Sequence, residues 1–411
     1  MGNVWRYLKK TVMYLAVVSM VLCGCGRMDR DGEVVINPDS QELMGVDFSD
    51  TSAQKGEKPA KKAKSSKAGT LIDTLPKAKI SEGYYYGTLG SEDRQLYNEI
   101  LSGLRAVDTA DLSQTDQDRV DVLFQYVCAD HPEIFYTDGY DITWKEILGK
   151  KTHMQLTGKY TYSKDEIETI MGKIEKERDK ILKNMPAYQD DYGRVRYIHD
   201  YIATHTSYDT GAKDNQSIVS VLLYQKSICA GYARTMQYLL NEAGIPCAYV
   251  WGNADGNTGR GIMTHAWNLV QADGDWYYLD VTFDDPSVSL DSGKDNFVKY
   301  DYFLITAKEL QATHTIDSSL ELPDCTATRD NYYIREGRIL GGYDKDRIRE
   351  MFLEASAKGE RYIIFRCESS GVFEMCRYKL IDEQEIFDMI GKRKSVSYSF
   401  DQEKLSMLFW L

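Results

Sequence analysis

Apolar positions recur at helical spacing between residues 230 and 243 and predict a buried helix there. The positions that repeat every three or four residues are Ala233, Met236, Leu239, Leu240 and Ala243. A glycine at 244 and a proline at 246 follow, and both residue types commonly end helices. We therefore expect a helix that begins near Ala230, with Cys229 at its N-terminal edge.

Two stretches downstream, 267–271 and 276–280, have the composition of strands and flank an Asp-Gly pair at 273–274. This dipeptide is a strong signal for a two-residue hairpin turn. Extended beyond residue 280, the register that such a turn imposes makes His265 and Asp280 diagonal neighbours on one face of the ribbon. Diagonal neighbours lie roughly 7–8 Å apart at the backbone, within reach of a hydrogen bond between the two side chains.

The pattern upstream predicts an N-terminal α+β accessory region, a largely helical lobe, over residues 80–184. Helices are expected at 92–107 and 116–130, and alternation within 142–162 suggests a hairpin. Ser163, with a glutamate three residues later, is the capping box of a long charged helix.

Two further domains follow from the same pattern. Residues 185–323 begin with a helix at 190–204 and contain the helix and hairpin described above, so they form the central domain. Residues 324–411 predict a small α+β domain. It should open with a strand at 332–339 and a helix at 344–358, and continue with a strand, a helix and two closing strands.

The first 24 residues are organised like a bacterial signal peptide. Three basic residues precede a largely apolar run of 12 residues at 11–22, which is too short to cross a membrane as a helix. Leu-Cys-Gly-Cys at 22–25 resembles the lipobox of bacterial lipoproteins, which makes Cys25 the expected site of lipid attachment. A plain signal peptide or an uncleaved anchor is the alternative. Residues 25–79 are lysine-rich and poor in apolar residues, and they predict a disordered tether to the membrane, on its extracytoplasmic face.

The composition excludes some classes of partner. A net charge of −13 argues against nucleic acid. Thirty tyrosines suit sheet packing, although binders of carbohydrate or peptide also use many. Of the eight cysteines, five remain after Cys23, Cys25 and Cys229 are set aside, an odd number without close pairs. We interpret them mostly as buried hydrophobes, and we expect no metal and no cofactor.

Cys229, His265 and Asp280 have the residue types of a thiol nucleophile, its base and the group that orients the base. The free N–H groups and the positive dipole end at a helix start favour the thiolate, which is the reactive form. The predicted hairpin places base and orienter on one face.

The motifs around these residues resemble those of the transglutaminase-like superfamily, in particular the bacterial domain found in exported proteins. They are C-x-G-Y-[AS] at 229, H-A-W-N at 265 and W-Y-x-[LV]-D-x-T-[FW]-D at 276. His265 follows Cys229 by 36 positions, and Asp280 follows His265 by 15. The resemblance covers about 84–314, ends near His314, and implies a papain-like catalytic core with these three residues as the triad.

The resemblance implies an extracytoplasmic, lipid-anchored thiol enzyme that acts on amide bonds of peptides, proteins or cell-wall peptide through a thioester. Hydrolysis, as by a peptidase or amidase, is the leading hypothesis. A cross-linking transglutaminase is one alternative, because an amine can resolve the thioester instead of water. A catalytically silent module that binds wall glycan or peptide is the other.

Several nearby residues have weaker claims to a role in the site. Tyr208 is a candidate oxyanion donor, by analogy with the aromatic donor of true transglutaminases. His199 and His205 are interpreted as structural, because a single triad needs one base. The glycine-rich stretch 253–261 is interpreted as an active-site rim, and the acidic pair at 284–285 as a turn after a strand.

Overall fold

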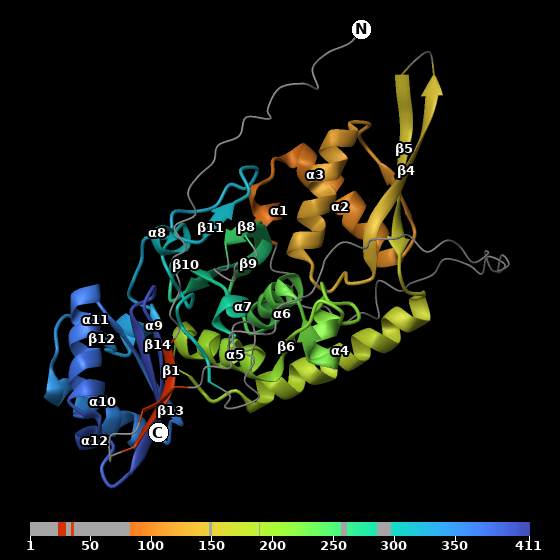
Figure 1. Cartoon of the computed structure of the whole chain (residues 1–411). Coiled ribbons are helices and arrows are strands. Elements are labelled where there is room, and N and C mark those ends of the chain that lie inside the picture. Colours follow the sequence, from red (N-terminus) through yellow and green to blue (C-terminus); the bar gives the residue numbers. More distant parts are fainter. Residues whose placement is uncertain are drawn as a thin grey trace. The chain divides into compact units, whose positions relative to one another are not determined.

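The computed structural model describes residues 24–29, 34–36, 83–147, 150–188, 190–255, 261–285 and 297–411 (Figure 1). The chain divides into two compact units. One contains residues 40–337, and the other combines residues 338–411 with the N-terminal residues up to 39. Every residue predicted to take part in catalysis therefore belongs to the first, larger unit.

An antiparallel sheet with the strand order β10-β9-β8-β11 holds His265. Its strands are β8 (Cys247–Asp255), β9 (Ile262–Ala272), β10 (Asp275–Leu279) and β11 (His314–Ile316). The turn between β9 and β10 has the predicted register, with Ala272 opposite Asp275. Asp273 and Gly274 both have positive φ, 48° and 93°, as tight hairpin turns require, which explains why an Asp-Gly pair stands here.

Helix α6 (Cys229–Glu242) packs against β8 and β9 (Figure 1). It begins and ends within a residue or two of the prediction, and its apolar face is buried. Asn268 on β9 fastens the helix to the sheet. Its Nδ2 atom donates to the carbonyl oxygens of Ala233 on α6 (2.9 Å) and Ala248 on β8 (3.3 Å). The helix that starts at Cys229 is thus held at a fixed position over the strand that carries His265.

Shorter elements complete the surroundings of the sheet. They are α5 (Asp191–His205), β6 (Ser207–Tyr208), η2 (Ser220–Tyr224), β7 (Lys226–Ser227), α7 (Val281–Asp284), α8 (Ala307–Leu310) and α9 (Tyr332–Arg335). Helix α5 packs on α6 and α7, and β6 pairs in parallel with β7.

The N-terminal lobe belongs to the same compact unit as the sheet. Its elements are α1 (Tyr84–Thr88), α2 (Ser91–Ala106), β3 (Thr109–Leu112), α3 (Gln117–Asp130), β4 (Thr137–Ile147), β5 (Lys150–Tyr160) and α4 (Lys164–Asn184). The capping box of Ser163 and Glu166 is present. The Tyr85 hydroxyl donates to the carbonyl of Tyr249 on β8 (2.7 Å). The lobe is therefore packed onto the sheet.

The smaller unit has its own sheet and core. Its sheet order is β12-β13-β15-β14-β1-β2. The elements are β1 (Gly24–Asp29), β2 (Val34–Ile36), β12 (Ile339–Leu340), α10 (Lys345–Ala357), β13 (Tyr362–Cys367), α11 (Ser370–Arg377), η4 (Tyr378–Asp382), α12 (Ile386–Met389), β14 (Ser395–Asp401) and β15 (Ser406–Trp410). Together they match the predicted small α+β domain, with two strands added from the N-terminus.

The boundary between the units differs from the predicted one at 324. Residues up to 337 remain with the larger unit because their side chains are buried in it. Tyr332 stacks on Tyr300 with ring centroids 3.7 Å apart, and Asp330 accepts a hydrogen bond from Tyr277 (3.0 Å). The strand predicted at 332–339 is also wrong at its start. The Asn331 side chain accepts from the N–H of Tyr333 and begins a short helix instead.

The N-terminal predictions fall largely outside the described residues. These include most of the signal peptide, the side chain of Cys25 and the lysine-rich part of the tether. Residues 24–29 and 34–36, which apart from residue 24 belong to the predicted tether, form strands, because β1 pairs with β14 over its whole length and with β2. Among the described residues, no helix is both long and apolar enough to cross a membrane.

Candidate active site

Cys229 is the first residue of helix α6 and is almost completely buried, with 9% of its surface exposed. The preceding residue, Ile228, has extended backbone, so the chain turns into the helix at the cysteine. The turn is crowded. A Cβ on Gly231 would collide with Oγ of Ser227 and lie 2.9 Å from Oγ of Ser220, which is why the C-x-G motif needs glycine at this position.

His265 lies on β9, opposite Gly252 on β8, and its side chain is buried. Its Nε2 atom donates to Oδ2 of Asp280 at 2.7 Å. The sulfur of Cys229 lies close enough to the ring to raise the pKa of His265. Because Nε2 is engaged by Asp280, Nδ1 is the nitrogen left to exchange a proton with the sulfur. The structure therefore brings together the three residues that the sequence singles out.

Asp280 reaches His265 by a route that the sequence analysis did not foresee. The paired part of the hairpin ends at Leu279, opposite Asn268, so the expected pairing of residue 280 and beyond does not form. Asp280 is instead the N-cap of helix α7. Its Oδ1 atom accepts from the backbone N–H groups of Thr282 (2.9 Å) and Phe283 (3.3 Å). Capping fixes one carboxylate oxygen and leaves the other to face the histidine.

The electrostatics of the site favour a charged histidine. Burial opposes the charge on His265, but the Asp280 carboxylate and the Cys229 sulfur outweigh it and raise the pKa of His265 to about 10. Burial opposes the charge on Asp280, but charge and hydrogen bonds from His265 and His314 hold the pKa of Asp280 below its usual range. At neutral pH the imidazole is therefore a cation that lies beside the sulfur of Cys229.

His314 is the residue of this site to which the sequence analysis gave no role. It is the first residue of β11, and its Nε2 atom lies 3.1 Å from Oδ2 of Asp280. The signal in the sequence was limited to its position at the end of the stretch that resembles the family. The contact joins residues 34 positions apart, and it forms because β11 pairs with β8.

His265, Asp280 and His314 are also the one group of described residues whose ligand atoms lie close enough together to hold a metal ion, within 4.8 Å. The two nitrogen-to-oxygen distances, 2.7 and 3.1 Å, are those of hydrogen bonds. A hydrogen on each histidine nitrogen, donated to the carboxylate, accounts for each contact. We therefore interpret the group as a hydrogen-bonded cluster.

Tyr208, the candidate oxyanion donor, lies on β6 opposite Ser227 of β7. It is thus beside the strand that leads into Cys229, and its ring centroid is 6.4 Å from that of Tyr232 on α6. This position is compatible with a donor near the nucleophile, and the role of Tyr208 remains a prediction.

The other polar candidates have structural partners. His199 is fully buried on α5, and its ring nitrogens contact Asp200 (3.0 Å) and Asp284 (3.2 Å). Burial opposes its charge, but hydrogen bonds and charge from these two carboxylates raise the pKa of His199 to about 9. Asp285 accepts from the Tyr232 hydroxyl (2.7 Å). The acidic pair at 284–285, predicted to form a turn after a strand, instead lies at the end of helix α7 and is a buried anchor for α5 and α6.

Two smaller predictions have mixed outcomes. His205 stacks on Tyr201 with ring centroids 4.1 Å apart, which agrees with a structural role. Of the glycine-rich stretch, residues 253–255 are the end of β8 and residue 261 precedes β9, whereas 256–260 lie outside the described residues.

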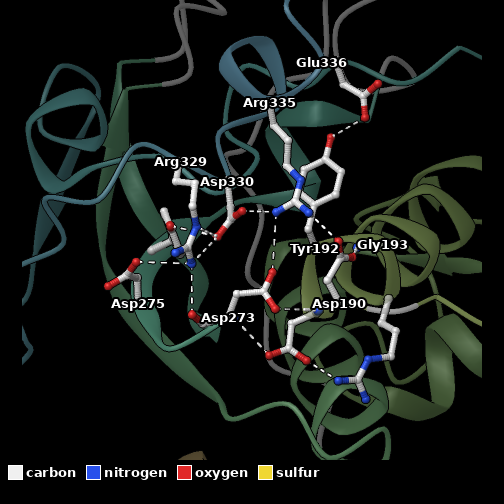
Figure 2. A network of polar contacts seen from close by, with 12 residues as sticks. Asp190, Tyr192, Gly193, Asp273, Asp275, Arg329, Asp330, Arg335 and Glu336 are labelled. Carbon is white, nitrogen blue, oxygen red and sulfur yellow. Dashed lines mark hydrogen bonds and ion pairs between the residues drawn. The ribbon is translucent and has the colours of Figure 1, made fainter.

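A polar network holds the hairpin against helix α5 (Figure 2). Arg335 makes ion pairs with Asp190 and Asp330 and lies 3.5 Å from Asp273 in the hairpin turn. The N–H of Asp191, at the start of α5, donates to Asp273 (3.0 Å). Because β9 and β10 lead from this turn to His265 and Asp280, the network fixes the far end of the two strands that carry the site.

Comparison with known proteins agrees with this geometry. Residues 180–281 match the transglutaminase-like superfamily. The kyphoscoliosis peptidase of Mus musculus is 33% identical over 127 residues, and its Homo sapiens counterpart shows the same identity. The match covers 28% of this chain and 19% of the peptidase, so the chain spans about a fifth of these relatives.

Solved structures give weaker likenesses. A TGase crystal structure is 18% identical and covers 44% of this chain and 50% of its own, with a TM-score of 0.24. The periplasmic domain of TgpA from Pseudomonas aeruginosa is also 18% identical and covers 32% of this chain and 55% of its own, with a TM-score of 0.22. Scores this low add nothing to the functional argument.

Proposed function

Because residues 180–281 form a domain of the transglutaminase-like superfamily, with an α+β fold, we propose that this protein is a thiol enzyme that hydrolyses amide bonds. The observation that carries the proposal is the 2.7 Å contact of His265 with Asp280, beside a cysteine at the first turn of α6. The substrates would be peptides, proteins or cell-wall peptide.

The first half of the reaction uses a Cys229 thiolate paired with the His265 imidazolium. The Cys229 thiolate attacks the amide carbon, and the electron pair of the carbonyl moves to its oxygen. As the carbon–nitrogen bond breaks, the His265 imidazolium gives its proton to the leaving amine through Nδ1. The acyl group is left on the sulfur as a thioester. Asp280 keeps the ring in position through Nε2.

The second half restores the enzyme. His265, now neutral, takes a proton from water, and the resulting hydroxide attacks the thioester carbon. The carbon–sulfur bond breaks, a carboxylic acid leaves, and the sulfur regains its negative charge beside the imidazolium. Water as the acyl acceptor gives a peptidase or amidase. A primary amine in its place would give a cross-linked product, which is the alternative that the chemistry leaves open.

We also propose that the enzyme works on the extracytoplasmic face of the membrane, held by a lipid on Cys25. The lipobox-like sequence at 22–25 and the lysine-rich stretch that follows support this placement. A wall or surface substrate would then be within reach of the tether.

The proposal is tested by incubating the full chain, in detergent, with peptide libraries and with peptidoglycan, and by identifying products with mass spectrometry. We expect new carboxyl ends in the wild type. Cys229→Ala should abolish them, because loss of a triad nucleophile costs about 10⁶-fold in a serine protease. Cys128→Ala, which changes a cysteine of the N-terminal lobe, should leave turnover unchanged. Persistent turnover in Cys229→Ala would overturn the assignment of the nucleophile.

A further inference from the structure

One oxygen of the Asp280 carboxylate contacts two histidine side chains. Nε2 of His265 and Nε2 of His314 lie 2.7 and 3.1 Å from Oδ2. Oδ1 accepts from two backbone N–H groups of α7. The triad described above accounts for His265 and leaves His314 unexplained, although its side chain is completely buried.

The hydrogen bonds around His314 fix its proton. Asp280 accepts at both oxygens, so Nε2 of His314 must carry the hydrogen that points at Oδ2. On the other side of the ring, Nδ1 lies 2.8 Å from Oγ1 of Thr313, which lies 3.0 Å from the Tyr302 hydroxyl. Nδ1 is therefore held by Thr313 and Tyr302, and Nε2 by Asp280. The ring has a hydrogen-bond partner at each nitrogen.

The packing around the ring also fixes its place. The ring centroid of His314 lies 4.9 Å from those of Trp267 and Phe283, and 5.4 Å from those of Tyr302 and His265. Asp280, His265 and Tyr302 are titratable groups that face it. One carboxylate is thus shared between two imidazoles.

We propose that His314 is a positioning residue, a second donor that holds the Asp280 carboxylate toward His265 and takes up part of its charge. This inference rests on the proposed function. Two consequences follow. Without this donor, Oδ2 of Asp280 is held by His265 alone, so the His265 ring is aligned less often. The carboxylate also keeps its full charge for His265, which then binds its proton more tightly and returns it to the leaving amine more slowly.

A matched pair of amides separates these roles. Gln places its amide near the position of Nε2, so His314→Gln keeps a donor on Asp280. Asn places its amide near Nδ1, so His314→Asn keeps the Thr313 contact and loses the donor. Both are polar and differ by one methylene. His205→Gln, on the outer part of α5, is the control for replacing a histidine elsewhere.

The first measurement is the titration of His265 by NMR of histidine-labelled full chain. The chain has six histidines, so single substitutions can assign every signal. We expect the His265 midpoint to rise in His314→Asn and to stay near the wild-type value in His314→Gln and His205→Gln. A purely structural role for His314 would leave the midpoint unmoved in both amides. This measurement needs no substrate, so it stands even if the proposed hydrolysis fails.

The second measurement is turnover. We expect kcat to fall about 10- to 100-fold in His314→Asn, the loss typical of residues that orient a functional histidine in metal sites, with KM unchanged. His314→Gln should recover most of kcat. The inference is overturned if folded His314→Asn keeps the wild-type midpoint. It is equally overturned if the His265 midpoint in folded His314→Gln rises as much as it does in His314→Asn. If His314→Asn does not fold, His314→Gln decides alone, and a midpoint far from the wild-type value overturns the inference.

Discussion

At the scale of single residues, the site depends on one carboxylate with four hydrogen-bond donors. Asp280 meets His265 and His314 at one oxygen and two backbone N–H groups at the other. Full hydrogen bonding is what allows a buried carboxylate to remain charged. The charge then holds the proton on His265.

Asp280→Asn tests the charge without removing the cap. Asn is as good an N-cap as Asp, so α7 should form and the protein should fold. In this variant the side-chain oxygen would accept from the N–H groups of α7, and the side-chain NH₂ group would face Nε2 of His265. Nε2 would then carry no hydrogen, which is the wrong tautomer for catalysis. We expect turnover to fall about 10⁴-fold, as in a serine protease triad, and less than in His265→Ala. Steady-state kinetics on the identified substrate would check this order, and equal losses would contradict it.

The raised pKa of His265 makes stability depend on pH. Its pKa is about 10 in the folded protein and about 6.5 in an unfolded chain. A raised pKa means that the stabilisation is fully present below about pH 6.5 and is lost as the pH rises toward 10. We expect the difference in Tm between wild type and His265→Gln to be constant near pH 5–6 and to shrink from pH 7 to 10. A Tm difference that grows as the pH rises would contradict a charged His265 imidazole in the folded protein.

At the scale of elements, three connections place the triad. Helix α6 begins at Cys229 because the chain is extended at Ile228, after β7, and because Gly231 lets the crowded first turn of the helix form. The Asp-Gly turn sets the register of β9 and β10, and the network around Arg335 in Figure 2 holds that turn to α5. The N-cap of α7 then turns Asp280 back toward β9. Together these connections align three separate elements.

Gly231→Ala tests the crowded start of α6. The added methyl would collide with Oγ of Ser227, so the first turn must shift and carry Cys229 with it. We expect a loss of about 1–3 kcal/mol in the free energy of unfolding, the usual cost of overpacking, together with lower turnover. Gly172→Ala on α4 is the matched control. Nothing lies near its added methyl, so it should stabilise by about 0.5–1 kcal/mol. Urea unfolding of both variants measures the contrast, and a neutral Gly231→Ala would refute the packing argument.

At the scale of the whole molecule, the chain has two compact units, and only the larger holds the proposed chemistry. The N-terminal lobe is part of that unit: Gln237 on α6 donates to the carbonyl of Ala129 at the end of α3 (2.7 Å). The lobe thus supports the helix of the nucleophile directly. The smaller unit has a separate core, built on β13, β14, β15 and α10.

Cys25→Ser tests the anchor that we propose for the whole molecule. Serine cannot take the thioether-linked lipid, so the protein should no longer be held by acyl chains. One attached chain binds only marginally, whereas two or more hold firmly. Fractionation of cells should move the variant from the membrane pellet to the supernatant. A variant that stays in the pellet would mean that the apolar run at residues 11–22 is itself the anchor.

Short-range chemistry determined much of this protein. The Asp-Gly pair fixed the hairpin turn because few dipeptides accept two positive φ values. Helical periodicity and a glycine stop fixed α6, and Ser163 with Glu166 fixed the start of α4. These features depend on residues within a few positions of one another, so the sequence alone contains them. The motifs at 229, 265 and 276 also indicated which residues meet.

The tertiary structure decided what depends on distant partners. His314 reaches Asp280 only because β11 pairs with β8, and His199 pairs with Asp284 across 85 positions. The hairpin register alone would have continued through Asp280, but the cap of α7 ended it. Residues 324–337 belong to the larger unit because Asp330 and Tyr332 are buried there. Burial and pairing of this kind are properties of the packed chain, since a polar residue shows its partner only once the folded core has excluded water.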